Sequence, residues 1–408
     1  MALECFTWTT ELLGSLLHTT CRVDDGETFE RLPDCLIIDI LSRLPPHSLL
    51  RCRWVCNCRH WRALVSLQDY FTTLHDDLCR ASRPMLLIHD HFAKYGQDLY
   101  VFGENKKKKK AAFKKLHLRP ELMINKHWEH LLSLIYYCQG VLLFASSKLE
   151  STYYVFNPIT EEEVTLQHTL HPSYLCALYF CPYTRQFRIL YVQVRDSCCQ
   201  YFICIFRTRM WRKIRLSSSF NFLPSRVNPA VVNGALHWVI LHDLERKNTP
   251  PCENGIMVFR MDKEEFSAMP HPGSTVCNPK QAYRTMTLFL KDDRLAFCNL
   301  LFPEYAIDIW ILEDYETRAW IRYKVNLSDR RIFPFNLCFM EIPSPIGDKS
   351  GRIKLLSVQE GELMLDMWNE GLILYNLYHR TMKRIELPRQ EMKLYTCSPH
   401  MKIFLVIA

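Results

Sequence analysis

Several features that would indicate an enzyme are missing from this sequence. Glycine accounts for only 12 of the 408 residues, which leaves little material for loops that cradle phosphate groups. No G-x-S-x-G, P-loop, H-E-x-x-H or C-x-x-C pattern occurs. The sequence therefore offers no candidate catalytic residue and no cofactor site, and we expect a protein that carries out no bond chemistry.

Long hydrophobic runs are also missing. The longest apolar stretches, such as VNGALHWVIL, are far too short to cross a bilayer. The first 21 residues contain Glu4 and Glu11 but no lysine or arginine, whereas a signal peptide begins with basic residues. We therefore expect a protein of the cytoplasm, the nucleus or both, with no membrane partner.

The 18 cysteines are scattered along the chain and accompany no export signal. This distribution is typical of reduced thiols, many of them buried as small hydrophobic side chains. Cys198 and Cys199 are adjacent, but no second pair follows at zinc-finger spacing. We expect neither a disulfide framework nor a bound metal.

The positive charge of the chain is concentrated in one run. Lys106–Lys110, Lys114 and Lys115 supply seven positive charges, and removing them from the formal net charge of +8 leaves +1. A protein that follows a phosphate backbone needs a broader basic surface. We interpret the run as a solvated loop, with a nuclear-localisation patch and a nucleic-acid contact as the weaker alternatives.

The segment that starts at Phe29 has the patterning of short helices. Pro33 suits the first turn of a helix, and Asp34 suits the positive end of its dipole. Ile37, Ile40, Leu41 and Leu44 share one apolar face of this helix, Leu36 and Ile38 widen that face, and Pro45-Pro46 ends it. Ser48 suits the N-cap of a second helix, and a third helical stretch contains Trp61, Leu64, Val65 and Leu67.

Three such helices make too small a core to be stable alone, so their surplus apolar surface must be covered by the rest of the chain or by a partner. The residues LPDCLIIDILSRLPPHSLLRCRWVC and HWRALVSLQDYFTTLH closely resemble an F-box of the plant type. The resemblance spans roughly residues 29 to 88 and implies docking on a Skp-type adaptor. The residues predicted to contact the adaptor are Leu32, Pro33, Ile37, Ile38, Ile40, Leu41, Leu44, Pro45, Leu49, Leu50, Val55 and Trp61.

One spacing departs from the family pattern. Trp61 comes five residues after Cys56, where the family has three, and two extra residues rotate a helix by about 200°. We predict that Asn57–His60 form a bulge or turn that returns Trp61 to the buried side. Cys52, Cys56, Cys58 and His60 have no second ligand pair at loop spacing, so we interpret them as packing and kink residues and not as zinc ligands.

After residue 130 the helical periodicity gives way to short runs rich in aromatic and β-branched residues, separated by turn signals. Five aromatic anchors, Phe156, Phe206, Phe259, Trp310 and Tyr375, are spaced by 50, 53, 51 and 65 residues. A period of about 50 residues is typical of propeller blades. Gln139-Gly140, Asn233-Gly234 and Glu360-Gly361 fit hairpin turns, Glu161–Glu163 and Asp292-Asp293 fit solvated turns, and the final MKIFLVIA fits a strand that closes the ring.

The phrases VFNPIT, VNGALHW and IDIWILEDY are similar to the F-box-associated domain of plant F-box proteins, a kelch-like β-propeller family. The expected fold is therefore α+β and multidomain, a small three-helix F-box followed by a mainly β, propeller-like domain. We predict an N-terminal extension at 1–28, the F-box at 29–75, a connector with the lysine-rich loop at 76–135, and the F-box-associated domain at 136–408, with an alternative start near 82.

These resemblances imply a substrate-recognition subunit of an SCF-type cullin-RING ubiquitin ligase. The F-box would reach cullin and RING subunits through the adaptor, and the propeller would hold a target protein that the sequence does not identify. The first alternative is a ligase-independent module that recognises a peptide, sugar or small ligand. The second is a nucleic-acid-associated protein that uses the lysine run.

Overall fold

The computed structural model describes Leu36, Asp39 and most of the chain from 86 to 398. Beyond those two residues the described segments are 86–90, 98–105, 110–116, 132–139, 141–146, 152–157, 162–167, 173–184, 186–195, 198–206, 208–215, 221–224, 228–243, 255–272, 286–301, 306–326, 353–359, 362–367, 371–376, 378–385 and 395–398.

The strands of these segments form six antiparallel sheets, which we call blades 1 to 6. Blade 1 has β1 (Leu86–Asp90), β2 (Asp98–Asn105), β3 (Lys110–Leu116) and β25 (Tyr395–Ser398); blade 2 has β4 (Leu132–Cys138), β5 (Val141–Ser146), β6 (Thr152–Asn157) and β7 (Glu162–Gln167); blade 3 has β8 (Ser173–Cys181), β9 (Gln186–Arg195), β10 (Cys198–Ile205) and β11 (Met210–Lys213). Blade 4 has β12 (Phe222–Pro224), β13 (Ala230–Val232), β14 (Ala235–Asp243), β15 (Ile256–Arg260) and β16 (Glu265–Met269); blade 5 has β17 (Met286–Lys291), β18 (Arg294–Leu301), β19 (Ala306–Asp314) and β20 (Ala319–Asn326); blade 6 has β21 (Ile353–Gln359), β22 (Glu362–Met367), β23 (Gly371–Asn376) and β24 (Thr381–Ile385).

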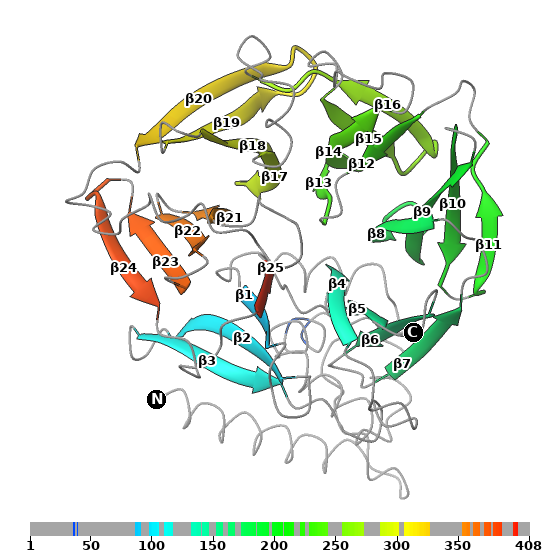
Figure 1. The fold of residues 1–408 in the computed structure, drawn as a ribbon, viewed down its shortest axis with the longest axis horizontal. Helices are drawn as coiled ribbons and strands as arrows, with labels where there is room; N and C mark the ends of the chain where they lie inside the picture. Colours follow the sequence, from blue (N-terminus) through cyan, green and yellow to red (C-terminus); the bar gives the residue numbers. More distant parts are fainter. Residues whose placement is uncertain are drawn as a thin grey trace, which may run out of the picture.

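The blades follow one another around a ring and form a β-propeller (Figure 1). Five of them are built from consecutive strands between residues 132 and 385. Blade 1 instead combines the two ends of the domain, because β25 pairs antiparallel with β1, with Leu87 opposite Ser398 and Asp90 opposite Tyr395. This pairing closes the ring.

The aromatic anchors of the sequence repeat occupy one structural position. Phe156, Phe259, Trp310 and Tyr375 lie in β6, β15, β19 and β23, and Phe206 directly follows β10. Each of these is the third of the four main strands of its blade, counted from the inside of the ring. The predicted period of about 50 residues is therefore confirmed as the blade repeat.

In blades 2 to 6, two to four residues separate the first strand from the second and the third from the fourth, whereas in blade 1 the first strand, β25, and the second, β1, come from opposite ends of the domain. Asn233 (φ 50°) and Gly234 (φ 68°) join β13 to β14, and Asp292 (φ 50°) and Asp293 (φ 58°) join β17 to β18. Two residues with positive φ form a hairpin turn whose twist matches that of the strands, and Asn, Asp and Gly tolerate this conformation best. The predicted turns at these two positions are confirmed, and Asp292 and Asp293 are exposed.

Because antiparallel strands alternate in direction, these first–second and third–fourth turns all lie at one end of the sheets, which we call the turn face. Contacts between neighbouring blades support this placement. A Cβ atom built on Gly234, in the β13–β14 turn, would lie 2.5 Å from the hydroxyl of Tyr183, in the β8–β9 turn. The two turns of blades 3 and 4 therefore meet on the same face.

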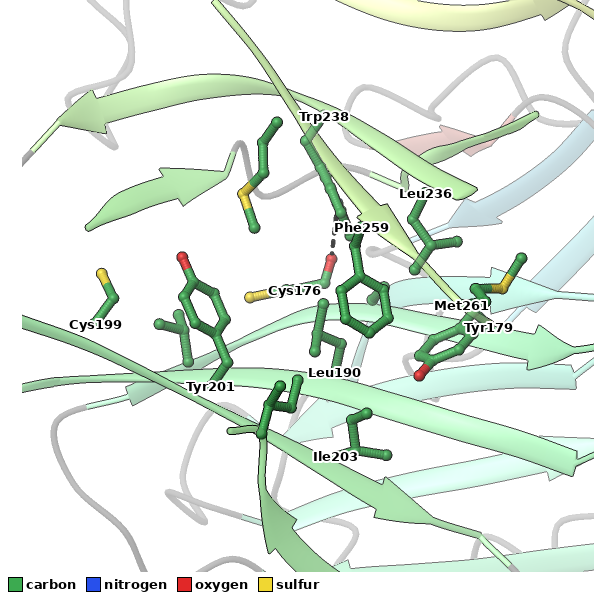
Figure 2. Packing of buried hydrophobic residues seen from close by; sticks show 14 of the residues in the cluster. Cys176, Tyr179, Leu190, Cys199, Tyr201, Ile203, Leu236, Trp238, Phe259 and Met261 are labelled. Carbon is green, nitrogen blue, oxygen red and sulfur yellow. Dashed lines mark hydrogen bonds between the residues drawn. The ribbon is translucent and has the colours of Figure 1, made fainter. Parts of the chain in front are cut away.

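The hydrophobic core lies between blades. One cluster combines residues of blade 3, such as Cys176, Tyr179 and Tyr201, with Trp238 and Phe259 of blade 4 (Figure 2). Further clusters join blade 2 to blade 3 and blade 4 to blade 5. Each of these blades thus buries its apolar faces against its neighbours.

Other sequence expectations have mixed outcomes. Glu162 and Glu163, interpreted as part of a solvated turn, belong to β7, where they pair with Asn157 and Phe156. The turn interpretation is wrong for these two residues, because the strand formed by the hydrophobic residues that follow them already begins at Glu162. MKIFLVIA lies outside the described residues, and the closing strand is β25.

Strands β1–β3 lie within 76–135, the range predicted as a connector.

The contact between Gly255 and His271 provides a test of blade packing. A Cβ atom at Gly255 would lie 2.1 Å from Cδ2 of His271, whose ring stacks on Phe297 of blade 5. We expect Gly255→Ala to lower the free energy of unfolding by about 2 kcal/mol, as for other overpacked cores. Urea unfolding of the single variants and of Gly255→Ala/His271→Ala measures the coupling, and strictly additive effects would contradict the assigned clash.

Candidate functional site

The predicted adaptor-binding residues lie outside the described residues: Leu32, Pro33, Ile37, Ile38, Ile40, Leu41, Leu44, Pro45, Leu49, Leu50, Val55 and Trp61. The same holds for the proposed bulge at Asn57–His60. Two neighbours of this set are described. Leu36 and Asp39 are both helical, and 49% of Leu36 is exposed. A large apolar side chain is therefore accessible on the first predicted helix.

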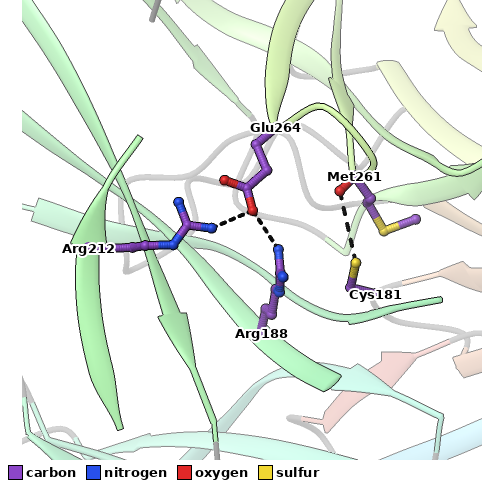
Figure 3. A network of polar contacts seen from close by, with 5 residues as sticks. All are labelled: Cys181, Arg188, Arg212, Met261 and Glu264. Atoms are coloured by element: carbon purple, nitrogen blue, oxygen red, sulfur yellow. Dashed lines mark hydrogen bonds and ion pairs between the residues drawn. The ribbon is translucent and has the colours of Figure 1, made fainter. Parts of the chain in front are cut away.

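Within the propeller, an ionic contact joins blades 3 and 4. Glu264, in the β15–β16 turn, accepts a 2.7 Å hydrogen bond at Oε1 from Nη1 of Arg188 (β9) and another at the same oxygen from Nη2 of Arg212 (β11) (Figure 3). The side chain of Arg188 is 6% exposed and that of Glu264 is 21% exposed. One carboxylate thus bridges two guanidinium groups across a blade boundary.

The electrostatics of this contact favour the ionised carboxylate. Burial raises the pKa of Glu264, but hydrogen bonds and charges from Arg212 and Arg188 outweigh that effect, and the net pKa lies below its usual value. The Nε atom of Arg188 and the hydroxyl of Tyr179 are buried without a hydrogen-bond partner. Burial, the largest effect on Tyr179, raises the pKa of its hydroxyl, so this side chain is neutral at pH 7.

Two buried side chains of β14 make further contacts across blades. Nε1 of Trp238 donates a 3.1 Å hydrogen bond to the carbonyl oxygen of Cys176 in blade 3. On the other side, Nε2 of His237 lies 2.7 Å from the hydroxyl of Tyr315 in blade 5, and Nδ1 lies 3.2 Å from the carbonyl oxygen of Ala230. Blade 4 is therefore tied by polar contacts to both of its neighbours.

The neutral form of His237 fits these partners. The carbonyl of Ala230 only accepts, so Nδ1 carries the proton, and Nε2 accepts from the Tyr315 hydroxyl. Burial lowers the pKa of His237 to about 4. A protonated ring would donate at both nitrogens, so the Tyr315 hydroxyl would have to accept from Nε2 and direct its own hydrogen elsewhere.

Burial makes two of the described thiols unreactive. Burial raises the pKa of Cys204 to about 11 and that of Cys199 to about 12, which suppresses the reactive thiolate. Among the residues that the structure describes, no group of three His, Cys, Asp or Glu side chains is placed to hold a metal ion. No helix in that part of the chain is long and apolar enough to cross a membrane.

Sequence reasoning did not find Arg188, Glu264, His237 or Tyr315. Glu264 stands in a charged turn, DKEE, that looks solvated in sequence. One signal was available, because Arg188 interrupts an apolar run, and a lone charge on such a strand requires a partner. Which carboxylate becomes the partner of Arg188 depends on how blades 3 and 4 pack together.

Comparison with known families assigns the class of protein to which this propeller belongs. Residues 95–397 match the F-box associated beta propeller domain, and residues 29–73 match the F-box domain. The chain therefore belongs to the F-box proteins that carry an F-box-associated β-propeller domain. Neither match is to an enzyme domain.

Relatives with both lengths well covered come from Arabidopsis thaliana. The chain is 25% identical over 392 residues to F-box protein At3g07870, which covers 86% of each chain. It is also 25% identical over 395 residues to putative F-box only protein 9, covering 90% of this chain and 92% of that one.

Two solved structures show a weaker similarity, with lower sequence identity. The β-propeller domain of the trilobed protease from Pyrococcus furiosus aligns with 60% of this chain and 68% of its own, at 12% identity and a TM-score of 0.34. YCF48 bound to a D1 peptide aligns with 76% of this chain and 79% of its own, at 8% identity and a TM-score of 0.36.

Removing the carboxylate of Glu264 should leave the buried charge of Arg188 without its partner. We expect Glu264→Gln to lower the free energy of unfolding by about 2 kcal/mol at pH 7. The matched control is Arg212→Ser, which removes the arginine that is 44% exposed and should cost less than about 1 kcal/mol. Denaturant unfolding measures both, and equal losses would contradict the assigned role of Arg188.

The stability of the propeller should fall with pH through His237. Its pKa of about 4 in the folded chain lies below the ordinary histidine value of about 6.5, so between these two pH values the unfolded chain binds a proton that the folded chain does not. The free energy of unfolding should therefore drop by about 2 kcal/mol between pH 7 and pH 5 on account of this residue. Urea unfolding of wild type and His237→Gln tests this, and parallel pH profiles would contradict it.

Proposed function

We propose that the protein is the substrate-recognition subunit of an SCF-type cullin-RING ubiquitin ligase. The F-box docks on a Skp-type adaptor and, through it, on the cullin and RING subunits, while the kelch-like propeller binds a target protein. The chain raises the effective concentration of a target lysine near the charged ubiquitin-conjugating enzyme and makes or breaks no bond itself.

The order of the two matched domains carries this proposal. An F-box at 29–73 is followed by a propeller at 95–397, which joins a small docking module to a large, closed binding scaffold. The proposed location is the cytoplasm, the nucleus or both.

The alternative function is a ligase-independent module that binds a peptide, sugar or small ligand through the propeller. The observation that favours it is the spacing of Trp61 from Cys56, which departs from the family pattern. Affinity purification from cells with the proteasome blocked, followed by mass spectrometry, separates the two functions. Recovery of an adaptor and cullin supports the ligase subunit, whereas their absence beside a specific ligand supports the alternative.

Adaptor binding should depend on the first helix of the F-box. Ile40 shares the predicted apolar face with Ile37 and Leu44, and a buried, unpaired carboxylate there costs several kcal/mol. We expect Ile40→Asp to abolish co-purification of the adaptor while the circular dichroism and urea midpoint of the propeller stay unchanged. Retention of the adaptor by this variant would reject the assignment of the docking face.

A further inference from the structure

The end of blade 3 that lies on the turn face exposes two large apolar side chains. Tyr183 lies in the turn between β8 and β9 and is 59% exposed, and Met210 begins β11 directly after the turn from β10 and is 65% exposed. Both turns join antiparallel neighbours at the same end of the sheet. Two strand spacings separate the two turns, so their centres lie about 10 Å apart.

Both apolar side chains are presented from turns that are held in place. The Tyr183 hydroxyl lies so close to Gly234 of blade 4 that a Cβ atom on this glycine would be 2.5 Å away. In the other turn, the backbone N–H of Arg209 donates a 2.9 Å hydrogen bond to the carbonyl oxygen of Ile205, and Arg209 has a φ of 53°. A partner that docks here therefore orders little of the chain, which lowers the entropic cost of binding.

The outer strand of blade 3, β11, adds positive charge beside these side chains (Figure 1). Residues 208–215 contain four cations and no acidic residue. One of the four, Arg212, binds Glu264 of blade 4. No carboxylate pairs with the other three in the part of the chain that the structure describes, and all of them are exposed: Arg209, Lys213 and Arg215. Three cations are thus available to an acidic partner.

Acidic residues of the following blades limit the extent of this positive surface. The matching hairpin of blade 4, residues 261–265, contains three acidic residues and one lysine. Residues 313–318 of blade 5 contain three acidic residues and one arginine. A phosphate backbone that ran along the turn face from blade 3 would meet these carboxylates. The surface therefore suits a short acidic segment and not a long polyanion.

We propose that Tyr183, Arg209, Met210, Lys213 and Arg215, which we call the blade 3 patch, bind a short, extended segment of the target protein that carries both apolar and acidic side chains. This inference rests on the proposed function and deepens it, since it names the docking surface and the chemistry of the target. Apolar side chains of the segment pack on Tyr183 and Met210, and its carboxylates pair with the three cations. In a polyproline-II segment, side chains on one side repeat every three residues, about 9 Å apart, which matches the distance between the two turns.

The test uses the full-length protein and three short fluorescein-labelled peptides. The first has Leu-Glu-Glu-Leu between Gly-Ser flanks, the second replaces both leucines with serine, and the third replaces both glutamates with lysine. The variants are Tyr183→Ser and Arg209→Ser/Met210→Ser. The matched control, Tyr378→Ser/Arg380→Ser, removes a tyrosine that is 79% exposed and an arginine with a φ of 51° from the corresponding turn of blade 6. Fluorescence anisotropy gives Kd at about 50 mM and about 300 mM salt.

We expect the wild type to bind the Leu-Glu-Glu-Leu peptide about fivefold more tightly than either altered peptide at low salt. Tyr183→Ser should lose the preference for leucine over serine, Arg209→Ser/Met210→Ser should lose both preferences, and the control should stay within about twofold of wild type. The preference for glutamate over lysine should shrink at high salt. Equal binding of the three peptides by wild type, unchanged preferences in both patch variants, or an equal loss in the control would overturn the inference.

Failure of this inference is distinguishable from failure of the proposed function. Wild type that co-purifies the adaptor but binds the three peptides equally would overturn the inference and leave the ligase function standing. Wild type that shows the peptide preference but recovers neither adaptor nor cullin would support the blade 3 patch and overturn the ligase function. A single-stranded oligonucleotide that binds wild type but not the patch variants, with no preference among the peptides, would assign the surface to nucleic acid and overturn the inference.

Discussion

Burial of apolar surface between neighbouring blades is the constraint on which the rest of the structure depends. The largest buried side chains, such as Trp238, Tyr201 and Phe259, lie where blades 3 and 4 meet. A single four-stranded sheet would leave such residues in water on both faces. The pairing of β25 with β1 therefore has a wider effect than its four residue pairs suggest, because it gives the first and last blades neighbours on both sides.

Polar contacts then fix how each blade sits against the next. Apolar side chains can still pack when two blades shift slightly against each other, whereas a buried hydrogen-bond donor loses free energy if its acceptor moves out of reach. Blade 4 shows this most clearly, with Trp238 bonded toward blade 3 and His237 toward blade 5. Glu264 adds a charge-assisted contact near the turn face, where solvent would otherwise enter between the outer strands.

The turn face combines rigidity with an uneven charge pattern. Hairpins with positive φ hold its residues in fixed conformations, as at Arg209, Glu264, Arg318 and Arg380. Between blades 3 and 4, Glu264 on this face pairs with Arg188 and Arg212, whereas the described hairpin of blade 6 presents the exposed residues Arg380, Lys383 and Arg384. A closed ring positions such charges without the conformational freedom of a long loop, which favours binding because little entropy is lost when a partner docks.

The sequence alone determined the architecture, since alternation of apolar residues, turn residues and an aromatic period of about 50 reflect local backbone geometry and burial. Phe156, Phe259, Trp310 and Tyr375 were placed correctly as repeat anchors for that reason, and Asn233-Gly234 was placed correctly as a turn. The tertiary structure decided the pairing of β25 with β1, the bond of Arg188 to Glu264 and the bond of His237 to Tyr315. Each of them joins residues far apart in the sequence, and such pairings depend on how the blades meet and how the ring closes, which no local pattern encodes.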